Sequence, residues 1–117
     1  MILDGTWIAV GAEFGGQHID DDFLSVITLK VKQEECELHI GGSTDTGSLK
    51  FLPHVIPMAF DFMSTNGPNK GKVYKAIYKT SGGFLVVCYN TAGTDRPKIF
   101  ITTPENQYSL VRYKRLE

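Results

Sequence analysis

Residues 26–40 read VITLKVKQEECELHI, and their hydrophobic side chains recur at every second position. The first half places Ile27, Leu29 and Val31 on one face and polar side chains on the other. The second half, ECELHI, alternates in the same way from Cys36 to Ile40, after the short polar join KQEE. Alternation with a period of two is typical of β-strands with one buried face. The stretch therefore predicts a tight β-hairpin that packs one face on a hydrophobic core.

The same alternation runs through most of the chain, and turn-forming residues separate the runs. The run FLVVCY at 84–89 is apolar on both faces, which predicts a central or covered strand. Regular spacing with short connections predicts an all-β, antiparallel sandwich or barrel. Closure into a barrel is favoured because it leaves no unpaired edges. Eight strands are predicted, with a further short piece near 98–102: 5–14, 26–33, 35–41, 46–51, 57–63, 72–79, 83–90 and 107–115.

One segment departs from the strand pattern. HIDDDFLSV at 18–26 places three carboxylates, Asp20, Asp21 and Asp22, before Phe23 and Leu24. Acidic residues are favourable at a helix N-terminus, and Asp accepts hydrogen bonds from the first free amides. The segment predicts a short helix or a loop, with the aspartates as its cap.

The size and composition of the chain fit one soluble globular domain over residues 1–117. The net charge of −1 gives no electrostatic reason to expect nucleic acid or an anionic membrane as partner. No apolar run is long enough for a transmembrane helix, so we expect no membrane insertion. The start, MILDGTW, lacks the features of a signal peptide. We therefore expect a cytoplasmic protein, or a mature extracytoplasmic fragment whose leader is absent.

The stretch GPNKGK at 67–72 imitates the phosphate-binding loop G-x-x-x-x-G-K-[ST]. Its spacing is one residue short, and Val73 stands where the magnesium-binding hydroxyl would be. The nucleotide loop also requires a helix after it, whereas KVYKAIYK alternates like a strand. The stretch is interpreted as a turn between two strands.

No set of residues predicts catalysis, a metal site or a cofactor. The three histidines share no metal-ligand spacing, and their polar neighbours place them at the surface. The thiol of Cys88 lies in an apolar run, which raises a thiol pKa and makes it inert. Cys36 and Cys88 are expected to be buried free thiols, with a single inter-strand disulfide as the alternative.

The two ends of the chain resemble those of lipocalin-type barrels. LDGTWIAV at 3–10 is similar to the Gly-x-Trp signature of their first strand. NGPNKGKVYKAIY (66–78) and GGFLVVCYNTAGTDRPKIF (82–100) resemble a narrower family, an uncharacterised lipocalin-like domain of bacteria that is abundant in planctomycetes. The resemblance extends from Leu3 to Arg115 and implies a small eight-stranded up-and-down barrel.

The resemblance also implies roles for three residues. Trp7 would close one barrel end, and a basic residue from the last strand, Arg112 or Arg115, would pack across its ring. A guanidinium over an indole is a favourable cation–π contact. The family supplies no shared activity, and many of its members look secreted or membrane-anchored. We expect this chain to differ from those members, because its start lacks the features of a leader.

Two hypotheses follow for a barrel of this kind. In the first, the barrel binds a small apolar ligand in a partly open interior. In the second, it binds a protein, for example as a toxin-neutralising immunity protein, through acidic loops around Asp20, Asp21 and Asp22. An alternative for the interior is that its aromatic residues only fill the core. The ligand-binding candidates are Phe60, Phe62, Tyr74, Tyr78 and Tyr89.

Overall fold

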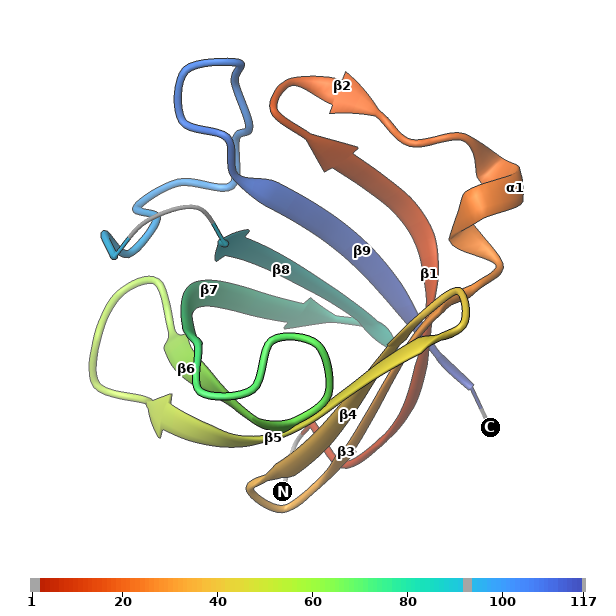
Figure 1. Ribbon diagram of the computed structural model, residues 1–117. Helices are drawn as coiled ribbons and strands as arrows, with labels where there is room; N and C mark the ends of the chain where they lie inside the picture. The colour runs from red at the N-terminus through yellow and green to blue at the C-terminus, as the bar shows by residue number, and fades with distance from the viewer. Residues whose placement is uncertain (1–2, 92–93, 117) are drawn as a thin grey trace.

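The computed structural model describes residues 3–91 and 94–116, which form a closed antiparallel β-barrel with one short helix (Figure 1). Eight of the nine strands make up the barrel, and the two-residue strand β2 only flanks β1. The elements are β1 (Gly5–Phe14), β2 (Gln17–His18), α1 (Asp21–Leu24), β3 (Ile27–Lys32), β4 (Glu35–Ile40), β5 (Ser43–Leu52), β6 (Ala59–Asn66), β7 (Val73–Ser81), β8 (Phe84–Asn90) and β9 (Ser109–Leu116).

The barrel closes through β1, which pairs with β3 along one edge and with β9 along the other. Trp7 lies opposite Leu29 of β3 and opposite Arg115 of β9. All other neighbours are consecutive in sequence, from β3 to β9. The predicted all-β fold and its closure are therefore confirmed. Closure satisfies the backbone groups of both edge strands, which an open sheet would leave unpaired.

The predicted extra strand near 98–102 is wrong. Residues 98–102 form bends and irregular backbone in the connection between β8 and β9. The physical reason is that β8 and β9 pair with each other, so the closed barrel offers no free edge there. Of the apolar residues that suggested a strand, only Phe100 packs on the barrel. Phe100 contacts the outer face of the barrel, whereas Ile99 and Ile101 are exposed.

The interior of the barrel holds the main core. Inward-facing side chains of all eight barrel strands contribute to it, and Leu3 from before β1 joins them. β3 follows the predicted pattern, since Ile27, Leu29 and Val31 are buried and alternate with more exposed polar residues. The predicted hairpin also forms, with Val31 opposite Cys36.

A second, smaller core lies on the outer face. Ala59, Ile77 and Cys88 are almost fully buried there, although their positions alternate with interior residues. The connection between β8 and β9 covers them with Phe100 and Tyr108. The prediction that β8 is a covered strand is therefore confirmed. One of its faces lies in the barrel interior, and the other lies under the connection between β8 and β9.

Arg96 fixes that connection to the barrel wall. Its guanidinium donates hydrogen bonds to the backbone carbonyls of Phe60 and Ala76 at 3.1 and 3.0 Å. It also forms an ion pair with Asp61, with 2.5 Å between Nη2 and Oδ1. A charged group bonded to the backbone of two neighbouring strands ties the connection to β6 and β7.

The two cysteines lie in different cores and are both free. Cys36 is in the interior cluster and Cys88 in the outer one, so the barrel wall separates them. The alternative of a disulfide between them is wrong. Burial raises the pKa of Cys36 to about 12 and that of Cys88 to about 11. Both thiols are therefore protonated at neutral pH and poor nucleophiles.

The predicted helix forms as the four-residue α1. Asp20 occupies the N-cap position, but its side chain makes no capping hydrogen bond, so this part of the prediction is wrong. Asp21 and Asp22 lie in the first turn, where negative charge is favourable. Leu24 is buried and attaches the helix to the core.

Candidate ligand cavity at the open end of the barrel

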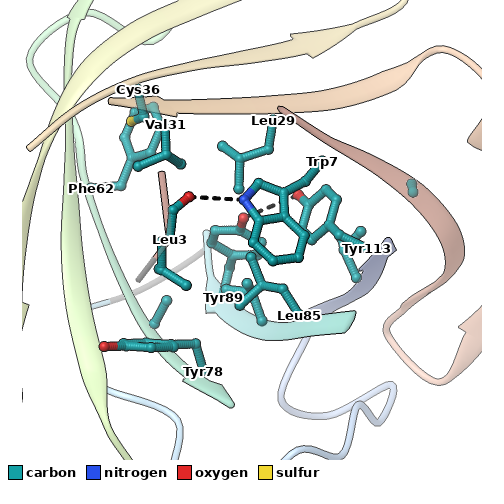
Figure 2. Packing of buried hydrophobic residues seen from close by; sticks show 14 of the residues in the cluster. Leu3, Trp7, Leu29, Val31, Cys36, Phe62, Tyr78, Leu85, Tyr89 and Tyr113 are labelled. Atoms are coloured by element: carbon teal, nitrogen blue, oxygen red, sulfur yellow. Dashed lines mark hydrogen bonds between the residues drawn. The ribbon is translucent and has the colours of Figure 1, made fainter. Parts of the chain in front are cut away.

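One end of the barrel is sealed by Trp7, whose side chain is 1% exposed. Its indole Nε1 donates a hydrogen bond of 2.9 Å to the carbonyl of Leu3, and Leu29, Leu85 and Tyr113 lie around the ring (Figure 2). Leu3 is equally buried, so the segment before β1 and the indole together fill this end.

Arg115 is the basic residue that packs on this plug. Its guanidinium carbon lies 4.2 Å from the centre of the Trp7 ring, and its Nη1 donates to the carbonyl of Asp4. Arg112 instead lies over Phe84 at 4.8 Å. The structure thus assigns Arg115 to the role that the sequence left open between the two arginines.

The opposite end of the barrel is open and contains a cavity of about 350 Å³. Its walls come from every barrel strand, and Ile19 and Phe23 beside and in α1 lie at its mouth. Most of its surface is hydrophobic. The lining residues are Ala12, Glu13, Phe14, Ile19, Phe23, Ile27, Leu38, Ile40, Asp45, Phe62, Asn69, Tyr74, Tyr89, Thr91, Ser109, Val111 and Tyr113.

The five predicted ligand-binding residues divide into two groups. Phe62, Tyr74 and Tyr89 line the cavity. Phe60 and Tyr78 do not line it and belong to the interior core, where their rings lie 5.5 Å apart, centre to centre, beside Phe51. The aromatic residues therefore both fill the core and line a cavity.

Two buried tyrosines meet in the deepest part of the cavity. The hydroxyls of Tyr89 and Tyr113 are 3.1 Å apart and share a hydrogen bond (Figure 2). Tyr113 is fully buried and lies opposite Ala9 on β1, two residues along that strand from Trp7. Burial raises the pKa of both phenols, so both are neutral hydrogen-bond donors near pH 7.

Tyr89 was predicted from the sequence as a ligand-binding residue, whereas Tyr113 was not. The signal was present, because Val111 and Tyr113 alternate with Arg112 and Lys114 in the last strand. A tyrosine in an alternating strand next to cationic residues faces the interior by the same rule that places Leu29 there.

The mouth of the cavity carries two carboxylates, Glu13 and Asp45, and no Lys, Arg or His is among the described lining residues. Asp45 accepts hydrogen bonds from the amide and side chain of Asn69, at 3.3 and 2.8 Å. It also accepts one from the hydroxyl of Ser64 at 3.3 Å. These bonds attach the 67–72 loop to β5, so the loop is part of the cavity wall.

The 67–72 loop is followed by strand β7 and not by a helix, as the sequence predicted. A β-carbon on Gly67 would lie 2.4 Å from the carbonyl oxygen of Thr44, and its φ of 119° is unfavourable for other residues. Glycine is therefore required for close packing on β5. The carboxylate of Asp45 beside the loop would also repel a phosphate.

The three aspartates proposed for partner binding, Asp20, Asp21 and Asp22, are all exposed. They lie between Ile19 and Phe23, which both line the cavity mouth. Phe23 itself is 47% exposed. The acidic segment thus borders the cavity rather than forming a separate surface.

The histidines form no cluster with other potential metal ligands within residues 3–91 and 94–116. His18 and His54 are exposed, as predicted. His39 is half-buried, with its Nδ1 2.9 Å from the hydroxyl of Thr44 and its Nε2 3.7 Å from Glu37.

Comparison of the chain with protein-family models, curated proteins and solved structures finds no match. In the part of the chain that the structure describes, no helix is long and apolar enough to cross a membrane.

Proposed function

We propose that this chain is a non-catalytic binding protein that holds one small apolar ligand in the open end of its barrel. The observation that carries the proposal is a hydrophobic cavity of about 350 Å³ at one end, with the other end sealed by Trp7. Ligand cavities in proteins span roughly 300–1,000 Å³. This volume is at the lower end of that range, which favours a small ligand.

The side chains around the cavity support binding without turnover. The two thiols have raised pKa values and neither lines the cavity. The phenols of Tyr89 and Tyr113 are ordinarily neutral at pH 7, and burial raises their pKa further, so they act as hydrogen-bond donors rather than bases. A rigid wall of hydrophobic and aromatic residues excludes water and gives affinity through apolar burial.

A neutral fluorescent probe tests the proposal. N-phenyl-1-naphthylamine becomes brighter in an apolar environment, and we expect its fluorescence to rise saturably on titration with the protein. Ala12→Phe places a large side chain in the cavity, since Ala12 is a lining residue, and should abolish the increase. Lys30→Phe adds the same ring at an exposed position of β3 and should leave binding unchanged. Equal binding by both variants would contradict the proposal.

A protein partner is the second candidate, and exposed hydrophobic residues at the mouth favour it. Phe14, Phe23 and Ile40 are 45%, 47% and 40% exposed. Apolar side chains beside charged ones are typical of protein interfaces. An immunity protein that neutralises a toxin would fit this surface.

Partner capture from the native source, with mass spectrometry of small molecules extracted from the purified protein, separates the two candidates. If a protein is captured, reversing the charges of Asp20, Asp21 and Asp22 should lower its association rate and the salt dependence of that rate. An unchanged rate would exclude the acidic segment from the interface.

A further inference from the structure

The hydrogen bonding of the Tyr89–Tyr113 pair is incomplete, and this bears on the ligand. Each phenol carries one hydroxyl proton, and the single bond between the two oxygens uses one of the two protons. Within the described residues, neither hydroxyl has another hydrogen-bond partner. The pair therefore presents one unused O–H donor in the deepest part of the cavity.

An unused donor at this depth points to an acceptor that is supplied from outside the chain. Tyr113 is 0% and Tyr89 6% exposed, and both line the cavity. Buried polar groups in proteins nearly always have hydrogen-bond partners, because an unsatisfied donor is costly in an apolar environment. The neutral state of both phenols means that the unused group is a donor and not an acceptor-only oxygen.

The charges of the cavity exclude one common class of apolar ligand. Its described lining includes the carboxylates Glu13 and Asp45 and no cationic side chain. A fatty-acid anion bound here would lie in an apolar cavity without a counter-ion and near two like charges, which is unfavourable. Arg112 and Arg115 cannot serve, since they lie over Phe84 and Trp7.

We infer that the cavity selects an uncharged apolar ligand whose buried end carries a hydrogen-bond acceptor oxygen, such as the carbonyl of an ester or ketone, bonded by the Tyr89–Tyr113 pair. This inference rests on the proposed function and specifies its ligand class. The hydrocarbon part of the ligand would contact Leu38, Phe62 and Val111, and its other end would face the mouth of the cavity.

The test compares three ligands of matched chain length by displacement of the neutral probe: decane, methyl decanoate and decanoate. We expect methyl decanoate to bind about three- to tenfold more tightly than decane, the gain from one neutral hydrogen bond. Decanoate should bind at least about tenfold more weakly than methyl decanoate at pH 8. Decanoate binding as tightly as the ester, or an ester no tighter than decane, would overturn the inference and leave the proposed function intact. Failure of all three and of the probe would overturn both.

Single and double tyrosine variants should behave differently, because one remaining hydroxyl can still donate to the ligand. In Tyr113→Phe the remaining hydroxyl of Tyr89 loses its partner, so its own proton is free for the ligand, and the ester should keep its advantage over decane. The double variant Tyr89→Phe/Tyr113→Phe has no donor and should bind both equally. Far-UV circular dichroism checks that each variant folds. If the double variant fails to fold, the three-ligand comparison on the unmodified protein decides alone, and an unchanged ester preference in a folded double variant refutes the inference.

Discussion

Replacing Trp7 with alanine removes the plug that seals one end of the barrel. A tryptophan buries about 150–250 Å², and the Trp7 side chain is 1% exposed. At about 25 cal/mol per Å² this burial corresponds to about 4–6 kcal/mol, as an upper bound. Alanine retains part of this burial, so the loss of free energy should be smaller. This agrees with the 3–5 kcal/mol typical of large aromatic-to-alanine changes in cores.

Two specific interactions of the ring are part of this cost and place it in the upper half of the range. The hydrogen bond from Nε1 to Leu3 leaves a buried carbonyl without its donor, at a cost of about 1 kcal/mol. The contact of Arg115 with the ring contributes about 0.5–2 kcal/mol. We therefore expect Trp7→Ala to lower the free energy of unfolding by about 4–5 kcal/mol, a large part of the 5–15 kcal/mol available to a typical domain.

Urea unfolding followed by far-UV circular dichroism measures this change, since the variant has lost the only tryptophan and fluorescence cannot compare the two proteins. Phe14→Ala is the matched control, because Phe14 is an aromatic residue of the same strand that is 45% exposed. Its cost should be about 1 kcal/mol or less. A Trp7→Ala cost below about 1 kcal/mol, or one equal to that of Phe14→Ala, would refute the role of the indole as a plug.

Three further predictions concern the sealed end and the thiols. Gly5→Ala should cost at least about 2 kcal/mol in urea unfolding, because a φ of 135° is strained for alanine, and the added β-carbon, 2.7 Å from Nη1 of Arg115, would displace that nitrogen from the carbonyl of Asp4. Gly82→Ala, at positive φ but with open space around it, should cost only the backbone strain of about 1 kcal/mol, and equal costs would argue against the close contact. Cys36 and Cys88 should not react with Ellman's reagent at pH 8 until the protein unfolds, whereas rapid reaction of the native protein would show that they are accessible. Their pKa values are raised from 9.0 to about 12 and about 11 in the folded protein. The stability that the buried neutral thiols contribute is therefore fully present below pH 9, falls above pH 9, and is lost once the pH has risen through 11 and 12. The free energy of unfolding should fall by up to about 1.4 kcal/mol per pH unit for each thiol, and a variant with both cysteines changed to alanine should lose this slope between pH 9 and 10.

The strands could be predicted from the sequence because the signal is local. Ile27, Leu29 and Val31 alternate with polar residues, and this period of two depends only on neighbouring positions. Closure of the barrel could be predicted because an open sheet would leave two edge strands unpaired, and this argument needs no knowledge of distant contacts. The connection between β8 and β9 could not be predicted in this way. Its position depends on Arg96, whose partners Phe60 and Ala76 are 36 and 20 residues away in sequence.

The cavity residues were predicted only in part, because depth along a barrel is not encoded in alternation. Phe60 and Phe62 are two residues apart on the same face of β6, yet only Phe62 lines the cavity. Which inward side chains share a level depends on strand tilt and register, which are properties of the closed barrel as a whole. The register that brings Tyr113 near the hydroxyl of Tyr89 is of this kind, since Tyr113 pairs with Leu85 rather than with Tyr89.

The two ends of the barrel differ because different side chains are available to fill them. At the sealed end, one large ring, Trp7, spans the interior, and Leu3 fills the space beside it. At the open end, Ala12, Ser109 and Thr91 are too small to meet across an eight-stranded barrel, and the large Phe14, Phe23 and Ile40 are 45%, 47% and 40% exposed rather than buried across the interior. The loop that contains Gly67 is bonded to Asp45 through Asn69 and forms part of the cavity wall. The cavity therefore lies at the end that no side chain spans, whereas the buried indole at the other end contributes the larger share of the stability.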